Sequence, residues 1–193
     1  MQHKFSELSD IISQRRTIKP QQMNGKLIED DIVNQLLSLA DWAPTHGRTE
    51  PWRFFVFAQE KVKQFCTDHA AMHRAAHPEK STDDVFLKLS KMGDSASHVI
   101  LVAMRRGHLP KIPVIEEIAA TAAAIQNILL GAQSLGIATY WGTGGSVLHN
   151  EMKDYVQLGE QDQVLGTLYL GYADMPAKEG LRNIPMSEKV KWM

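Results

Sequence analysis

The chain has 193 residues, of which 44% are hydrophobic and 22% charged, and its formal net charge is −1. This composition is typical of a soluble globular protein and excludes a disordered chain, while the length suits one domain with a sizeable core. The near-neutral charge, without a run of Lys and Arg, gives no reason to expect a nucleic acid partner. We therefore expect a single domain over residues 1–193.

The N-terminal sequence and the cysteine content favour a cytoplasmic protein. Residues 1–10 include Lys4, Glu7 and Asp10 and lack the apolar stretch of a secretory signal. The single cysteine, Cys66, excludes an internal disulfide and agrees with a reducing compartment. No uninterrupted apolar run approaches the ~18 residues of a membrane span, so we expect no membrane partner.

The first predicted helix covers residues 5–16 and ends on Arg15-Arg16-Thr17. Adjacent arginines followed by a hydroxyl can clasp a phosphate through forked hydrogen bonds. A solvated helix end also favours basic residues, because the negative end of the helix dipole lies there. Taken alone, this pair of arginines favours the solvated helix end.

The next predicted helix, residues 28–41, leads into a polar loop and a strand over 52–58. Three acidic residues begin the helix, and its expected buried stripe is Ile32, Val33, Leu36, Leu37 and Leu39.

Two prolines and a glycine shape the loop between this helix and the strand. Pro44 and Pro51 restrict the backbone, and Gly47 supplies freedom between them. The hydrogen-bonding residues His46, Arg48 and Glu50 lie between Trp42 and Trp52, an arrangement that suits a flat polar ligand. An ordinary connection anchored by two tryptophans explains the same residues equally well.

The predicted helix from Gln59 to about His77 contains Cys66, His69, His73 and His77 at spacings that could chelate a divalent ion. Such i, i+4 histidines arise freely on polar helix faces, and the chain has no His-Glu-x-x-His motif. We therefore interpret this face as solvated surface and predict no metal site.

The middle of the chain alternates helices with a buried strand. Residues 83–96 read as a helix, and residues 97–104 as a strand in the middle of a sheet. Residues 105–113, with two prolines and a glycine, predict an exposed excursion. Residues 115–135 form the longest predicted helix, rich in alanine and buried on several sides, which suits a central helix or a subunit interface.

Gly136 is placed to end the long helix, and a short strand over 137–141 runs into Gly142-Thr143-Gly144-Gly145-Ser146. Three glycines in four residues let the backbone approach a ligand closely, although a simple tight turn also accounts for them. Val147 stands where a dinucleotide fingerprint requires its third glycine. A short helix over 147–157, a strand over 164–172 and a tail from Asp174 complete the chain.

Four of these segments stand in an order that resembles the nitroreductase family of flavin mononucleotide (FMN) enzymes, in particular its short members. The resemblance spans about residues 11–172. It is carried by RRT at 15–17, WAPTHGRTEPWRFFV at 42–56, AAIQNILLGAQSLGIATYW at 123–141 and LYLGYAD at 168–174.

The resemblance implies an α+β fold of three layers, with a mostly antiparallel central sheet surrounded by helices. It also implies a homodimer with FMN at the interface and exchanged C-terminal segments, so the tail over 174–193 would pack on the partner subunit. The whole chain would then be one nitroreductase-like FMN-binding domain.

The resemblance further implies roles for individual residues. Arg15, Arg16, Thr17 and, from the tail, Arg182 would hold the phosphate and ribityl end of FMN. Trp141, Gly142, Thr143 and Gly144 would border the ring or the ribityl chain. Trp42, His46 and Arg48 would reach the flavin bound mainly by the partner, and Asn127 in the alanine-rich helix is a further cofactor-binding candidate.

The activity implied is that of an FMN-dependent oxidoreductase with ping-pong kinetics. Hydride would pass from NADH or NADPH through flavin N5 to a small organic electron acceptor such as a nitroaromatic or a quinone. The protein would supply orientation and electrostatics, so no catalytic side chain is predicted. Two alternatives stay open: a flavin-binding carrier or sensor without significant turnover, and a metal-dependent protein using Cys66 and the three histidines.

Overall fold

The computed structural model describes residues 2–175 and 179–193; residues 176–178, which belong to the expected tail, and Met1 lie outside the described residues. Its strands form one antiparallel sheet in the order β1-β2-β4-β3. The strands are β1 Trp52–Ala58, β2 His98–Met104, β3 Ala138–Gly142 and β4 Gln163–Gly171. The α-helices are α1 Gln2–Gln14, α2 Asp30–Ala40, α3 Glu60–Ala76, α4 Asp83–Ser90, α5 Val114–Ser134 and α6 Asn150–Tyr155, with short 3₁₀ helices η1 Pro20–Gln22, η2 His46–Arg48 and η3 Met186–Glu188.

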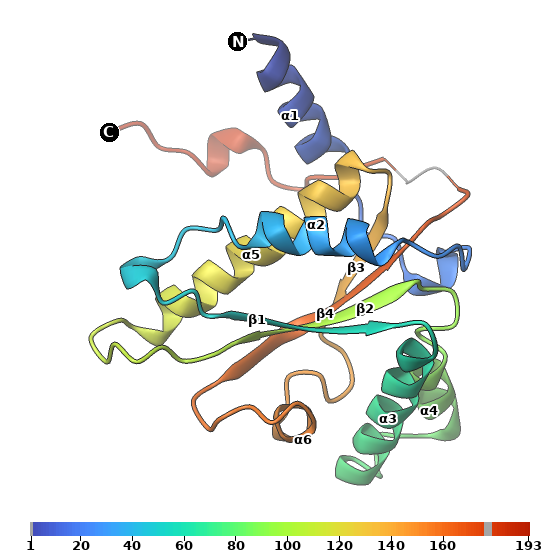
Figure 1. Cartoon of the computed structure of the whole chain (residues 1–193). Helices are drawn as coiled ribbons and strands as arrows, with labels where there is room; N and C mark the ends of the chain where they lie inside the picture. The colour runs from blue at the N-terminus through green and yellow to red at the C-terminus, as the bar shows by residue number, and fades with distance from the viewer. Residues whose placement is uncertain (1, 176–178) are drawn as a thin grey trace.

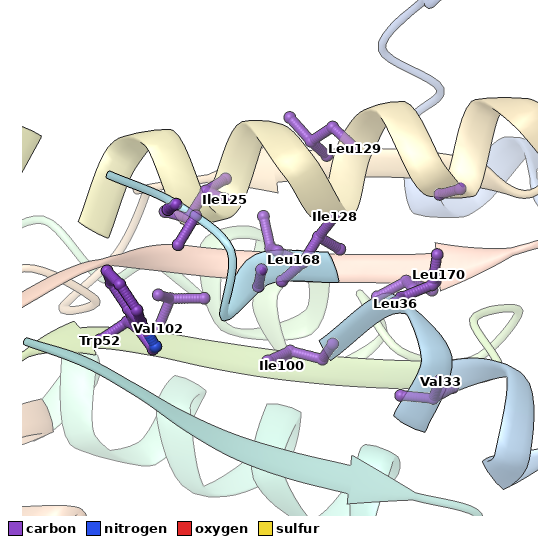
Figure 2. Packing of buried hydrophobic residues seen from close by; sticks show 14 of the residues in the cluster. Val33, Leu36, Trp52, Ile100, Val102, Ile125, Ile128, Leu129, Leu168 and Leu170 are labelled. Carbon is purple, nitrogen blue, oxygen red and sulfur yellow. The ribbon is translucent and has the colours of Figure 1, made fainter. Parts of the chain in front are cut away.

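Helices cover both faces of the sheet, which gives the three layers expected from the sequence (Figure 1). On one face α2 and α5 lie over the strands. Figure 2 shows their contact, with Leu36 of α2 beside Leu170 and Ile128 of α5 next to Leu168. On the other face a second apolar cluster joins α3 and α6 to the sheet, and α4 packs on α3.

Strand β2 lies in the interior of the sheet, as predicted, and every one of its residues is buried. Its side chains alternate between the two clusters: Ile100 and Val102 contribute to the first, and Val99 and Leu101 to the second. A strand buried on both faces reads as a continuous apolar run, which is why the sequence identified it.

Helix α5 also forms as predicted and ends in a Schellman motif. Gly136 has a φ of 69°, and the amide of Ile137 donates to the carbonyl of Ala132 over 2.9 Å. Helix α5 is long and apolar enough to cross a membrane, but the core helices of soluble proteins meet the same criteria of length and composition. Here its residues Ile125 and Ile128 pack against the sheet.

Helix α4 is shorter than expected and ends at Ser90 instead of residue 96. The backbone at Gly93 lies against α3, so closely that a Cβ there would stand 2.6 Å from Val62 and 2.9 Å from Cys66. Tertiary contact with α3 therefore overrides the helical pattern. Helix α6 is likewise confined to Asn150–Tyr155, because His149 before it is extended.

The segment 105–113 is largely exposed, as its prolines and glycine suggested, but it is anchored to the rest of the fold. Ile112 is fully buried, and Arg106 pairs with the buried carboxylate of Glu117 and donates to the carbonyl of Ile112 over 2.6 Å. The amide of Gly107 donates to the same carboxylate over 3.0 Å. Because a buried carboxylate needs such partners, this segment is fastened to α5.

Candidate functional site

The Arg15-Arg16-Thr17 segment lies beside the edge strand β3. Thr17 forms a parallel bridge with Thr139, and the amide of Ile18 donates to the carbonyl of Thr139 over 2.9 Å. The guanidinium of Arg16 donates to the carbonyls of Ser13 and Arg15. Helix α1 has ended by this point, so the arginines sit on an extended segment that continues the sheet.

Arg182 of the C-terminal tail joins these residues. Burial, followed by the positive charges of Arg16 and Arg182, lowers the pKa of Arg15. The backbone at Gly180 also lies against the Arg16 guanidinium, where a Cβ would overlap it. We call Arg15, Arg16 and Arg182 the arginine cluster; three neighbouring guanidinium groups suit a multidentate anion such as a phosphate.

Strand β3 lies beside Thr17 at Thr139 and ends at the glycines. Trp141 is partly exposed, and its indole NH donates to the carbonyl of Leu165 over 2.9 Å. The carbonyl of Gly142 accepts the hydroxyl of Thr167, whereas Thr143 and Gly144 are exposed. A Cβ at Gly144 would meet no atom within 4 Å, so there is open space beside its backbone.

A cavity of about 270 Å³ lies between these glycines and helices α3 and α4. Gly142 and Gly144 are the predicted site residues that line it. Its other lining residues include side chains that the sequence did not single out as ligand contacts: His69, His73, Lys88, Met92, Tyr140 and Tyr169. The i, i+4 spacing of His69 and His73 was the one sequence signal that pointed to any of these side chains.

The interpretation of the α3 histidines as solvated surface is wrong. His69 is only 3% exposed, Cys66 is fully buried, and His73 is half-buried. Burial, and then the charge of His73, lower the pKa of His69 to about 4. Burial raises the pKa of the Cys66 thiol to about 11. Among the described residues, no group of three or more His, Cys, Asp or Glu side chains is arranged to hold a metal ion.

His46 and Arg48 lie far from these groups, because the loop that contains them leads into β1 at the opposite edge of the sheet. His46 Nδ1 is 2.6 Å from Glu116 Oε2, at the start of α5. Arg48 is exposed and has a φ of 54°. Within one chain, this loop cannot touch a ligand bound between the arginine cluster and Gly144.

The two indoles do not flank the polar loop as its sequence suggested. Trp52 is buried in the core and donates to Asp41 Oδ1 over 2.9 Å, whereas Trp42 is 85% exposed. The hydrophobic contacts of the sheet draw Trp52 inward, so Trp42 alone is available to another molecule.

Trp42 and Asn127 border a third region, a groove of about 380 Å³ between α1, α2 and α5. Asn127 donates to the carbonyl of Leu39 over 3.0 Å and so ties α5 to the end of α2. Leu39, expected to be buried, is exposed at this groove, as are Leu8 and Trp42. The predicted site residues thus fall into three separate regions of one chain.

Comparison with known proteins gives a consistent result. Residues 12–172 match the sequence model of the Nitroreductase family. A Bacillus subtilis (strain 168) protein named "Putative NAD(P)H nitroreductase YfhC" is 26% identical over 191 residues, which cover 97% of this chain and 94% of the relative. "Putative NAD(P)H nitroreductase YdjA" of Escherichia coli (strain K12) is 26% identical over 143 residues, 74% of this chain and 76% of the relative.

Solved structures share the fold over nearly the whole chain. The nitroreductase-like family protein of Bacillus cereus aligns with a TM-score of 0.80 at 25% identity, covering 96% of this chain and 95% of the other. A Desulfovibrio desulfuricans protein described as a "putative nitroreductase in complex with FMN" aligns with a TM-score of 0.74 at 20% identity, covering 96% of each chain. These likenesses confirm the predicted α+β, nitroreductase-like fold.

Proposed function

The chain belongs to the nitroreductase family, and from this premise we propose that it is an FMN-dependent oxidoreductase that takes electrons from NADH or NADPH. Relatives named NAD(P)H nitroreductases support the donor, since two of them align over most of this chain. A family relative of the same fold described as bound to FMN supports the cofactor. The structure contributes a site whose chemistry fits that cofactor.

The observation that carries the proposal is the placement of the arginine cluster and the glycines along one strand. Thr17 is paired with Thr139, and Gly142 lies three positions after Thr139 along β3. At the usual rise per strand residue this is about 10 Å. A five-carbon ribityl chain with its phosphate can bridge such a span, so the phosphate fits at the arginines and the ring at Gly142 and Gly144.

Each part of this site has a task that its chemistry suits. The arginine cluster would bind the phosphate by charge-assisted hydrogen bonds, and Thr17 would lie beside the ribityl chain. Because Gly142 and Gly144 have no side chains, the flat ring could lie against their backbone, next to the cavity that they line. Bound FMN would supply the redox chemistry, accepting hydride from a nicotinamide and passing it to an acceptor. The chain itself binds and orients, without a nucleophile.

The acceptor that we propose is a small organic molecule such as a nitroaromatic or a quinone. The cavity of about 270 Å³ next to Gly144 is lined mainly by apolar and aromatic side chains, among them Leu89, Met92 and Tyr140. Such a lining favours flat, weakly polar molecules. Nicotinamide and acceptor would use the same place in turn, which gives ping-pong kinetics.

Two copies of the chain complete the site in this proposal. His46 and Arg48 lie at the opposite edge of the sheet from the arginine cluster of their own chain, so they, together with the exposed Trp42, would contact the FMN of the partner subunit. The exposed apolar residues of α1 and of the tail, such as Phe5, Leu8 and Trp192, would be covered in the same dimer. We further propose that the chain is one domain and acts in the cytoplasm.

An absorption spectrum tests the proposed function. The purified protein, supplied with FMN, should be yellow, and NADH or NADPH should bleach the oxidised-flavin band under anaerobic conditions. A protein that binds FMN tightly but is reduced by neither nicotinamide would instead be a flavin carrier or sensor. Failure to bind FMN at all would overturn the proposal.

A further inference from the structure

Four histidines gather where α3 meets the segment that follows β3. Helix α3 presents His69 and His73 four residues apart on one face, and His77, the residue that follows the helix, has its ring 5.3 Å from that of His73. His149 faces them from the other side. We call residues 142–149 the glycine loop; it runs from the end of β3 to the start of α6 and contains the glycines that border the cavity.

Three hydrogen bonds tie the glycine loop to this face of α3. The backbone amide of Ser146 donates to His69 Nε2 over 3.1 Å, and Ser146 Oγ is 3.2 Å from His73 Nδ1. Further along, His77 Nε2 is 3.0 Å from His149 Nδ1. The loop is therefore held through both its backbone and its side chains.

The packing between the loop and His69 is close. Gly145 has a φ of 65°, and a Cβ at this position would stand 2.6 Å from His69 Nε2. Ser146 is fully buried. Gly144 and Gly145 have no side chains of their own to fix the loop, so its conformation depends on what it rests on.

From these contacts we infer that the α3 histidines, and His69 above all, are positioning residues that hold the glycine loop in the shape that presents Gly142 and Gly144 to the flavin ring. The role of the loop in FMN binding rests on the proposed function. The role of His69 in holding the loop does not, and it can be tested without a cofactor.

His69 can hold the loop only while its ring is neutral. Nε2 accepts the Ser146 amide hydrogen and so carries no proton, and the buried Nδ1 has no hydrogen-bond partner among the described residues. A protonated ring would present N–H to N–H at Nε2 and would lose the acceptor for Ser146. Its low pKa, about 4, agrees with this environment.

Acid should therefore release the glycine loop from α3. The titratable and charged side chains that surround the histidines act in both directions: the basic ones oppose proton uptake, and Glu79 favours it. They are Glu79 and Lys80 after α3, Lys88 of α4, His149 of the glycine loop, and Tyr140 and Tyr169 of the sheet.

Two substitutions of His69 distinguish the loss of the hydrogen-bond acceptor for Ser146 from the loss of the titrating imidazole. His69→Leu removes the acceptor of the Ser146 amide, whereas His69→Gln offers a carbonyl acceptor that does not titrate. Hydrogen exchange of residues 143–149 in the FMN-free protein, corrected for intrinsic rates, reports on the loop. The FMN dissociation constant, measured by flavin fluorescence between about pH 4.5 and 8, reports on the site.

We expect His69→Leu to speed the exchange and to weaken FMN binding, each on the order of tenfold. His69→Gln should keep both near the wild-type values at neutral pH and should remove the acceleration of exchange that acid causes in the wild type. His108→Leu, which changes an exposed histidine in the segment 105–113, should alter neither measurement.

Wild-type exchange and FMN affinity in His69→Leu would overturn the inference. Should His69→Leu not fold, the glutamine variant decides, because a wild-type response to acid in its exchange would contradict the role of His69. Should the protein bind no FMN, the proposed function fails, while exchange in the FMN-free protein still shows whether the histidines hold the loop.

Discussion

At the scale of single residues, the arginine cluster gathers three positive charges in one part of the site. Arg15 and Arg16 are half-buried, and burial together with the charges of Arg16 and Arg182 lowers the pKa of Arg15. Like charges held close together where they are partly buried from solvent destabilise the folded protein. A bound phosphate removes this repulsion, so the cluster indicates an anion site better than any one of its arginines does.

Arg16→Ala should weaken FMN binding by about 1.5–3 kcal/mol, the usual contribution of a hydrogen bond to a charged group. Fluorescence titration of FMN-free protein measures the change. Arg105→Ala is the matched control, because Arg105 is exposed at the end of β2 near Pro51 and lies outside the proposed site. An unchanged affinity in Arg16→Ala would remove the phosphate from this cluster.

His69 should make the stability of the protein depend on pH. Its pKa is lowered from 6.5 to about 4 in the folded state, so the unfolded chain binds the extra proton. Stability is then complete above about pH 6.5 and falls as the pH drops toward 4, by about 3 kcal/mol at roughly 1.4 kcal/mol per pKa unit. Urea unfolding across this range should show the decline, and His69→Gln should flatten it. A wild-type curve that is level from pH 7 to 4.5 would contradict the assignment.

At the scale of elements, the sequence predicted what local pattern determines and missed what tertiary contact determines. Strand β1 has the predicted bounds, Trp52–Ala58, while β2 differs from prediction by one residue at its start and α5 by one residue at each end. Their apolar periodicity agrees with their burial. Helix α4 stops early because Gly93 packs against α3, a contact that no local pattern contains.

The candidate site shows the same division. Arg15-Arg16-Thr17 and the glycines could be found in the sequence because they are short, polar and flanked by regular elements. The histidines of α3 could not be assigned, since i, i+4 spacing is the same on a solvated face and on a buried one. What buries His69 is the glycine loop, more than 70 residues further along the chain.

The loop before β1 offers a prediction at this scale, because it rests on the segment 105–113. Gly47 has a φ of 62°, and a Cβ would stand 2.7 Å from Ile112 and 3.0 Å from Leu109. Gly47→Ala should cost about 2–4 kcal/mol of stability through backbone strain and overpacking. Gly25→Ala separates the two causes: its φ is 77°, but a Cβ there would meet nothing within 4 Å, so strain alone should cost about 1 kcal/mol. Equal losses in the two variants, measured by urea unfolding, would show that Ile112 moves aside freely.

At the scale of the whole molecule, one chain leaves its site divided and its apolar surface uncovered. The arginine cluster and Gly144 lie at the β3 edge, and His46 lies at the β1 edge. Large apolar side chains are exposed on α1, at the groove beside it and along the described part of the tail. They include Phe5, Leu8, Ile12, Leu39, Trp42, Leu181, Ile184 and Trp192. A second copy that covers these residues could also bring His46 to the other chain's FMN.

Dimerisation and FMN binding should therefore fail together. The wild type should sediment at about twice the 21.7 kDa of one chain. Leu8→Glu places a charge in the groove beside Trp42, where desolvation within an interface would be costly, so it should yield monomers. Leu87→Glu is the matched control, since Leu87 on α4 is 50% exposed and Leu8 is 51% exposed.

Because a monomer would lack the contacts of Trp42, His46 and Arg48 from the partner, Leu8→Glu should also lose at least tenfold in FMN affinity, on the order of one charged or aromatic contact. A Leu8→Glu monomer that binds FMN as well as the wild type would show that each chain holds its cofactor alone.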